Sequence, residues 1–225
     1  MKKYLFLISL ILGVSFSVNA QSSRDYIKQN IREKNECKSV AITKTNGDAM
    51  IYGRNGYAAK ACPSAFVNAL SELNDQNKEI QDINLSESGR WLILYGRNGM
   101  RWGDLYPSLE KKIKSFNDKG EKITTVTFND LSEWIVITTE HISASSSEIQ
   151  DWLVEGCDDY GTLWTACITD DACVAVYESG YRFLGDVPKD LKDALTSCTS
   201  DVFMVKMAGS AWFFSCTDGY WRYNM

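Results

Sequence analysis

Two kinds of apolar pattern alternate along the chain. Residues 123–128, Ile-Thr-Thr-Val-Thr-Phe, place apolar side chains at alternate positions, which puts them on one face of a β-strand. A polar turn follows at residues 129–132, and residues 134–137, Trp-Ile-Val-Ile, then form a continuous apolar run. Such a short run is typical of a strand buried on both faces. The two strands and the polar turn between them predict a β-hairpin.

This hairpin pattern recurs at a nearly constant spacing. Sliding the chain by 43 residues places residues 40–42 on residues 83–85 and then on residues 126–128. Later steps of about 40 and 39 residues reach residues 166–168 and 205–207. A period near 40 over successive copies indicates a repeat architecture. The sequence therefore predicts five copies of one supersecondary unit.

The pentapeptide Tyr-Gly-Arg-Asn-Gly occurs at residues 52–56 and again at residues 95–99. It lies where the second strand of each hairpin ends, so it is interpreted as a turn. Its last glycine aligns with a glycine in the other turns, which predicts a positive φ at that position. The aligned glycines are Gly56, Gly99, Gly180 and Gly219. The residues that follow, such as 57–59 and 181–183, can form a short third strand.

A helix is predicted after the turn in four copies. In the first copy Phe66, Leu70 and Leu73 share one helix face, because a spacing of four and then three residues covers one side of a helix. Three copies begin this helix with a proline, which the first helical turn tolerates. These prolines are Pro63, Pro107 and Pro188.

The third copy starts its helix differently, because residues 145–148, Ser-Ser-Ser-Glu, form a capping box. Gly120 and Gly156 are interpreted as helix ends. One more helix is predicted over residues 22–36, just before the first strand, with Tyr26, Ile27 and Ile31 as its apolar residues.

The fifth copy has no helix of its own, whereas the chain begins with an unmatched one. If the two ends meet, each hairpin gains a helix and five strand–strand–helix units close into a ring. The alternative is an open stack, whose end repeats need polar caps. Residues 213–214, Phe-Phe, and Trp221 suit such a cap poorly, which favours the ring. We place the units at about residues 22–62, 63–106, 107–145, 146–187 and 188–225 of a single domain, 21–225.

Five strand–strand–helix units around a fivefold axis resemble the α/β-propellers. Penteins, the enzymes that modify guanidino groups, are the best-known members, and a ribosome anti-association factor shares the shape. The resemblance covers residues 21–225 and rests on topology and unit length. It implies an α/β repeat fold, and a shared fold does not imply a shared function.

The first twenty residues have the pattern of a secretory signal peptide. Lys2 and Lys3 precede an apolar run over residues 4–18, and Val-Asn-Ala at 18–20 is a small-residue cleavage site. Removing the two lysines in this segment changes the net charge from −5 to −7. An acidic chain without a basic run argues against nucleic acid as a partner, and no further stretch is apolar and long enough to insert in a membrane. We expect an exported protein, periplasmic or extracellular.

The chain has seven cysteines, all after residue 20. In an exported protein, disulfides with one thiol left over are the first interpretation. A fully reduced set of small buried residues is the alternative.

The sequence offers no catalytic constellation. Pentein enzymes use a nucleophilic Cys, a His and paired acids, but this chain has one histidine, His141, with no Cys–His signature around it. We therefore predict no catalytic residues, no metal site and no cofactor. A diverged pentein-like enzyme with Cys167, Cys173 or Cys216 as nucleophile stays an alternative, as does a secreted inhibitor or immunity-type protein.

The remaining candidates are binding residues. Arg54 and Arg97 occupy equivalent turns of neighbouring repeats, and such turns converge on one face of a ring; His141 takes the Asn position of the same turn in the third repeat. Arg101 and Trp102 combine a guanidinium with an aromatic ring, a pair that grips peptides or glycans. Solvated charges and packing between repeats explain these residues as well. The sequence favours a non-enzymatic binding protein with a protein or glycan partner on the turn face.

Overall fold

A computed structural model of the chain describes residues 21–45 and 47–225. The predicted signal peptide, residues 1–20, lies outside the described residues. Within the described part of the chain, no helix is both long and apolar enough to cross a membrane.

Five helices and fifteen strands alternate regularly over the described residues. The helices are α1 (Ser23–Lys34), α2 (Ser64–Asp75), α3 (Pro107–Asp118), α4 (Ser147–Tyr160) and α5 (Lys189–Thr196). The strands of the first three sheets are β1 (Ser39–Ala41), β2 (Asp48–Tyr52), β3 (Gly56–Lys60), β4 (Ile80–Leu85), β5 (Trp91–Tyr95), β6 (Gly99–Gly103), β7 (Ile123–Phe128), β8 (Trp134–Thr138) and β9 (Ile142–Ala144). Those of the last two are β10 (Leu163–Ile168), β11 (Ala172–Tyr177), β12 (Tyr181–Gly185), β13 (Val202–Ala208), β14 (Ala211–Cys216) and β15 (Trp221–Asn224).

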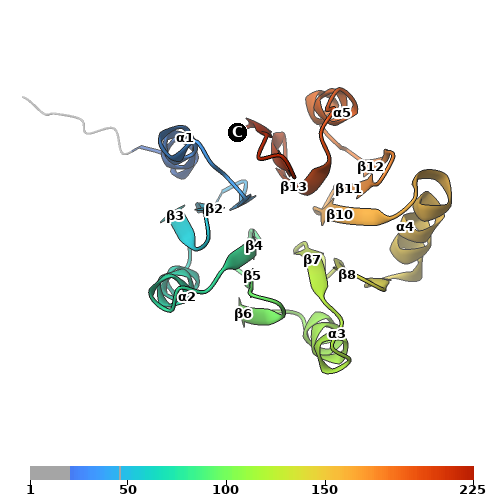
Figure 1. The fold of residues 1–225 in the computed structure, drawn as a ribbon, viewed down its shortest axis with the longest axis horizontal. Coiled ribbons are helices and arrows are strands. Elements are labelled where there is room, and N and C mark those ends of the chain that lie inside the picture. Colours follow the sequence, from blue (N-terminus) through green and yellow to red (C-terminus); the bar gives the residue numbers. More distant parts are fainter. Residues whose placement is uncertain (1–20, 46) are drawn as a thin grey trace, which may run out of the picture.

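Each group of three consecutive strands forms a separate antiparallel sheet with its strands in sequence order. The sheets lie around a common centre with the helices on the outside (Figure 1). The first strands are innermost: β1 contacts β4, β4 contacts β7, β7 contacts β10, β10 contacts β13, and β13 contacts β1. Among the described residues these contacts join separate sheets, and the ladders stay within each three-stranded sheet.

The predicted α/β repeat fold is confirmed at this level. The short third strand that the sequence allowed after the turn is present in all five copies, where it pairs with the middle strand, so each unit has three strands. This third strand carries a weak pattern. In β6, for example, every residue is half-buried, so no alternation of apolar and polar positions marks it.

The core lies between neighbouring sheets and the helix that covers them. Phe66, Leu70 and Leu73 of α2 are fully buried against Ile83 of β4 and Ile93 of β5. The helix stripe predicted from the sequence therefore faces the core. Apolar side chains at equivalent places build the other clusters, and the tryptophans of the middle strands, Trp91, Trp134 and Trp212, are all buried.

The two glycines of the repeated pentapeptide have different tasks. The first takes the left-handed conformation, with φ of +54° at Gly53 and +57° at Gly96. The second, Gly56 or Gly99, packs under the ring of Tyr52 or Tyr95, where a Cβ atom would collide with the ring. The prediction of a positive φ was therefore wrong for Gly56 and Gly99, and also for Gly180. At Gly219, with φ of +86°, it is confirmed.

The helix boundaries match the predicted signals with two exceptions. Pro107 is the first residue of α3, Pro63 and Pro188 directly precede α2 and α5, and Gly120 has φ of +76° just after α3. The third-copy cap is Ser146 rather than Ser145: its hydroxyl accepts the Ile149 N–H at 3.2 Å.

Gly156 is the second exception, because it does not end its helix. It lies buried inside α4 beneath the Tyr177 ring, where a Cβ atom would collide with the phenol. The helix continues to Tyr160, and Gly161, with φ of +82°, follows its last residue. Gly156 therefore serves close packing inside α4, and its interpretation as a helix end is wrong.

The two ends of the described chain are in contact. Ile27 and Ile31 of α1 are buried in one cluster with Met50 of β2 and Phe213 of β14. The Lys28 Nζ donates to the main-chain oxygen of Met225 at 3.0 Å. Nearer the centre, Ser215 Oγ donates to the carbonyl of Lys38 at 2.8 Å. The first helix therefore packs against both the first and the last sheet.

The disulfide prediction is not met: all seven cysteines are free thiols. The sulfurs of Cys198 and Cys216 lie 3.6 Å apart, which is contact rather than a bond of about 2.05 Å. Burial among apolar neighbours is the alternative that the sequence left open, and Cys37, Cys167, Cys173 and Cys216 are buried.

Candidate binding site

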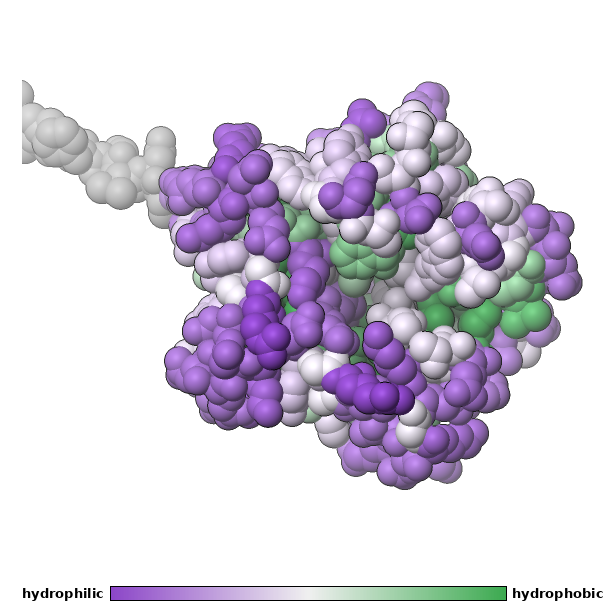
Figure 2. Space-filling view, in the orientation of Figure 1, coloured by the Kyte–Doolittle hydropathy of each residue, from purple (hydrophilic) through white to green (hydrophobic). Residues whose placement is uncertain are grey.

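The innermost strands begin around a cavity of about 630 Å³ at one end of the central axis. We call this cavity the axial basin. Its lining comes from all five repeats and comprises Lys38, Glu79, Gln81, Lys122, Ile123, Thr124, Thr138, Thr139, Thr162, Leu163, Trp164, Asp201, Phe203, Met204 and Thr217. In the space-filling view down the axis the molecule is hollowed near the centre, while hydrophilic residues cover the part over α1, α2 and α3 (Figure 2).

Each repeat contributes an equivalent residue to the axial basin. These residues are separated by 43, 43, 40 and 39 positions, the spacings of the repeat itself: Lys38, Gln81, Thr124, Trp164 and Phe203. They share a place at the start of the first strand but no chemistry: Lys38 directly precedes β1, and the other four are the second residues of their strands. The repeat therefore builds one cavity whose wall differs from sector to sector.

The wall of the basin combines apolar and polar surface. Trp164 of β10 and Phe203 of β13 are half-buried and are the two aromatic residues of the lining. The lining also contains two positive side chains, Lys38 and Lys122, and two negative ones, Glu79 and Asp201. Exposed large aromatic surface beside charges of both signs is typical of binding surfaces in proteins.

Below the basin, the first strands carry a buried polar network. Lys206 of β13 places its Nζ 2.9 Å from Asp82 Oδ1 and 2.7 Å from Asn84 Oδ1, both on β4. Asp82 also accepts the Ser39 hydroxyl at 2.7 Å, and Thr125 donates to Thr165 at 3.2 Å. Bonds between equivalent positions of different sheets fix the first strands relative to one another, which gives the basin a rigid base.

At the opposite end of the axis, acids in the first turns join one repeat to the previous one. Asp130 accepts the Ser86 hydroxyl at 2.8 Å and the Ser88 N–H at 3.1 Å, and Asp170 accepts the Asp130 N–H at 3.0 Å. Glu87 accepts the N–H groups of Lys44 and Thr45 in the same way. These acids leave a cavity of only about 50 Å³ at that end. The axial basin is therefore the larger opening.

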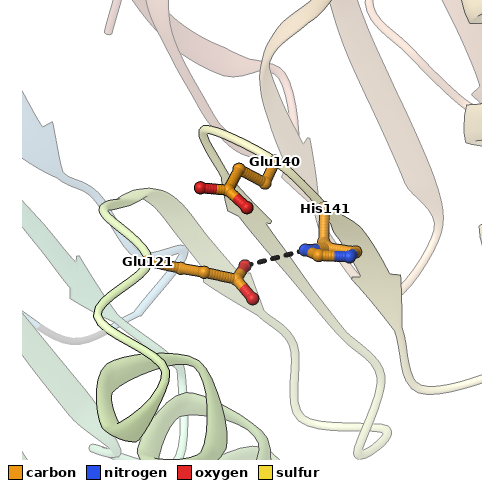
Figure 3. Close-up of side chains that lie close together, drawn as sticks. All are labelled: Glu121, Glu140 and His141. Carbon is orange, nitrogen blue, oxygen red and sulfur yellow. Dashed lines mark hydrogen bonds and ion pairs between the residues drawn. The ribbon is translucent and has the colours of Figure 1, made fainter.

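Glu121, Glu140 and His141, which we call the rim cluster, lie beside the basin (Figure 3). Glu121 precedes β7, and the other two residues belong to the turn between β8 and β9. The Nδ1 atom of His141 is 2.9 Å from Glu121 Oε2. Glu121 also accepts the hydroxyl of Thr138, a basin residue, at 2.8 Å. The cluster is thus tied directly to the wall of the basin.

Arg54 and Arg97 lie in turns on the basin end of the molecule but do not line the cavity. The turn of Arg97 is anchored there, because the Gly96 N–H donates to the carbonyl of Glu79 at 2.8 Å. Arg54 is exposed and donates from Nε to the Asn77 carbonyl at 3.3 Å. The Ile80 N–H donates to the Arg54 carbonyl at 2.9 Å. The turns of both arginines are on the same face as His141, and binding by either arginine stays a prediction.

Arg101 and Trp102 lie elsewhere, on β6, which contacts the outer helix α2. Arg101 pairs with Glu72 of α2, and this hydrogen bond raises the pKa of the guanidinium above its ordinary value. Trp102 packs on the core cluster under α3, with Lys114 Nζ 5.6 Å from its ring centroid. The structure does not bring this pair together with the axial basin. Both residues line a separate cavity of about 380 Å³ beside α2, and binding by this pair stays a prediction.

Sequence reasoning missed the residues that build the site. Trp164 and Phe203 were hidden because their equivalents in the other repeats are Lys, Gln and Thr, so no motif connects them. The repeat spacing was the available signal. Applied from Lys38, it leads to Trp164 and Phe203. Glu121 was missed because it lies 20 residues before His141 and only the β7–β8 pairing brings them together.

The three cysteines named as possible nucleophiles lie in environments that oppose a thiolate. Burial raises the pKa of Cys167 and of Cys173 above the ordinary value for a thiol. Burial, together with the neighbouring Cys198, raises the pKa of Cys216 to about 12. A catalytic cysteine needs the opposite shift, because the thiolate is the nucleophile.

Comparison with known proteins identifies no family. No family model and no curated protein matches the chain. A solved structure described as "YCF48 bound to D1 peptide" is similar over 82% of this chain and 49% of its own, so the present chain spans about half its length. Its sequence identity is 8% and its TM-score is 0.30, a likeness too low to carry an argument about fold or function.

Proposed function

We propose that this chain is an exported binding protein that takes a protein partner at the axial basin. The observation that carries the proposal is the basin itself, a cavity of about 630 Å³ to which all five repeats contribute. Ligand sites are concave, largely apolar and few in number on a protein, and the aromatic pair Trp164 and Phe203 supplies a suitable anchor.

A protein partner suits the distribution of charge around the basin. Arg54 and Arg97 lie in the turns of the first two sheets, whereas Glu140 and Asp218 lie in turns of the third and fifth. A polypeptide can present acidic and basic side chains to the two sides and an apolar side chain to the aromatic pair. Complementary charge of this kind favours specificity and fast association.

The scaffold we propose is a closed α/β-propeller. Its support is the contact between β13 and β1, the Ser215–Lys38 hydrogen bond and the position of α1 against the first and last sheets. In a closed ring α1 covers the last sheet, as its packing against Phe213 of β14 indicates. Closure also gives the basin a complete wall, which an open stack would lack.

Export is the third element of the proposal. It rests on the basic start, apolar run and small-residue cleavage site within residues 1–20. In this view the partner is a component of the cell envelope or a protein outside the cell. An enzymatic role finds no support in the environments of the candidate cysteines.

The test is site-specific photocrosslinking in the cells that produce the protein. A photoreactive phenylalanine replaces Phe203 or Trp164 in the basin, and the matched control replaces Val154, an exposed residue on the outer helix α4. We expect one protein adduct from both basin positions and none from the control. Adducts of equal pattern from all three positions would overturn the proposal.

A second arm separates the kinds of partner. Arg54→Ala combined with Arg97→Ala should reduce the yield of the adduct if the acidic side of a protein partner faces these turns. An adduct that disappears after glycosidase treatment would identify a glycan instead. If the captured protein is a hydrolase that loses activity at a one-to-one ratio, the protein is a secreted inhibitor.

A further inference from the structure

The rim cluster gathers two carboxylates and an imidazole from two parts of the chain. Glu121 lies in the connection between α3 and β7, and Glu140 and His141 lie in the β8–β9 turn. The register Ile123↔Thr138 between β7 and β8 brings the connection and the turn together. One ligand atom from each residue lies within 4.8 Å of the others. In Figure 3 the Glu140 carboxylate and the His141 ring both lie on the side of the Glu121 carboxylate.

Glu121 is held in place before any ligand arrives. Its side chain is only 5% exposed, and the Thr138 hydroxyl donates to Oε2 at 2.8 Å. The His141 ring lies on the same carboxylate oxygen, with Nδ1 2.9 Å from Oε2. Two partners therefore fix the position of this oxygen.

The turn that carries the other two residues is fixed by the same threonine. The N–H groups of Glu140 and His141 donate to Thr138 Oγ1 at 3.1 and 2.8 Å. The His141 ring stacks on Phe116 of α3, with 6.0 Å between centroids and 22° between planes. The imidazole is thus oriented by a neighbouring element outside the cluster, with Nδ1 directed at Glu121.

Lys119 acts electrostatically on Glu121 but forms no ion pair with it. No lysine or arginine in the described parts of the chain forms an ion pair with Glu121 or Glu140; the ion-pair partner of Glu121 is His141. The hydrogen bond between His141 and Glu121 involves one carboxylate. It does not account for the second carboxylate, Glu140, in the same cluster. The two carboxylates repel each other, and a cation bound between them and the imidazole removes this repulsion.

We propose that Glu121, Glu140 and His141 bind a divalent transition-metal ion at the edge of the axial basin. One imidazole nitrogen and two carboxylate oxygens form a ligand set used by Zn²⁺ and neighbouring first-row ions. The ion replaces the direct contact between Nδ1 and Oε2. His141 and Glu140 are exposed, so the remaining coordination position faces solvent. This inference does not depend on the proposed partner.

The experiment is calorimetric titration of the mature chain, freed of metal with a chelator, with ZnCl₂; MgCl₂ is the hard-ion comparison. We expect one Zn²⁺ per chain and no comparable heat with Mg²⁺. Glu140→Gln and His141→Ala should each weaken binding at least about tenfold. Both residues are exposed at a turn, so these variants retain the fold, which circular dichroism checks.

The matched control is Glu178→Gln. Glu178 lies at the corresponding turn of the fourth repeat, exposed and without a neighbouring histidine, so its replacement should leave Zn²⁺ binding unchanged. Absence of Zn²⁺ binding to the unaltered chain would overturn the proposal. So would binding that persists with equal affinity in both Glu140→Gln and His141→Ala, because thiols or the chain terminus would then hold the ion.

Discussion

Lys206 of the fifth repeat and Asp82 of the second form a buried ion pair, with Nζ 2.9 Å from Oδ1, although 124 residues separate them. Their side chains are 9% and 1% exposed. Asn84, Ser39 and the Ile83 N–H satisfy further atoms of the pair. The pair joins β4 and β13, whose contacts are otherwise with β1 and with different further strands. It places a specific interaction at the common centre of the sheets.

Lys206→Met should strongly destabilise the protein. It leaves the Asp82 carboxylate buried without its cation, and breaking a buried pair in this way costs about 3–5 kcal/mol. Adding Asp82→Asn should recover part of the loss, because neither buried charge is then orphaned. Urea unfolding measures the free energy of each variant.

The control for this variant is the exposed pair Lys189–Asp193 on α5, whose side chains are 87% and 63% exposed. Asp193→Ala should change the free energy of unfolding by no more than about 0.5 kcal/mol. If Lys206→Met costs no more than this surface variant, the central pair does not hold the first strands together.

Asp130 should give the protein a stability that depends on acid pH. Partial burial opposes its ionisation, but hydrogen bonds from Ser88 and Ser86 lower the pKa of the folded carboxyl below the ordinary 3.8. The folded state therefore favours the ionised form. Its contribution is complete above the ordinary value and is lost as pH falls through the lower folded value.

Asp130→Asn removes this titration. Unfolding curves measured from pH 6 down to about pH 2 should fall more steeply for the unaltered protein than for Asp130→Asn, with the difference confined to the region below about pH 4. Parallel curves over the whole range would show that the turn acids do not join the repeats in the way the hydrogen bonds indicate.

The thiols should differ in their reaction with iodoacetamide. Burial raises the pKa of Cys37, Cys167 and Cys173, and raises that of Cys216 to about 12. These four should be modified in the native protein much more slowly than the partly exposed Cys157 and Cys198. Mass spectrometry of proteolytic peptides measures the rates. Fast modification of Cys167, Cys173 or Cys216 would instead favour the diverged enzyme.

Oxidation should join one specific pair of cysteines. With sulfurs already 3.6 Å apart, Cys198 and Cys216 need only a small displacement to form a disulfide. Glutathione disulfide is the oxidant: the pair loses two hydrogens and two molecules of glutathione thiol are formed. We expect a 198–216 linkage in non-reducing peptide maps and none in Cys198→Ser. A different dominant linkage would contradict the arrangement of α5 against β14.

The sequence predicted the features that repeat with the same chemistry. Helix stripes such as Phe66, Leu70 and Leu73 and the buried runs of the middle strands recur in kind, so periodicity located them. The third strands were harder to predict. Their residues are half-buried, as in β6, so apolar and polar positions do not alternate along them. Gly56 was assigned the wrong conformation because its role is contact with the Tyr52 ring, which only the fold brings over it.

The site was harder to predict than the fold for the same reason. Lys38, Trp164 and Phe203 occupy equivalent positions of their repeats, but their side chains differ in chemistry. The repeat therefore predicts the position and not the kind of side chain. Of the predicted site residues, Arg54, Arg97 and His141 lie on the basin end of the molecule. Arg101 and Trp102 lie on an outer strand, because the residues after the turn run back along the sheet away from that end.

The proposed closure of the ring is tested most directly by zero-length carbodiimide crosslinking of the untagged chain 21–225. Lys28 lies 3.0 Å from the main-chain oxygen of Met225, and it also pairs with Asp25 at 3.1 Å, which serves as an internal control. A chain whose ends meet should yield, within the monomer, an amide between the Lys28 amine and the terminal carboxyl of Met225. If the Lys28–Asp25 amide forms while the link to Met225 is absent, or occurs only between two molecules, the ends do not meet and the repeats form an open stack.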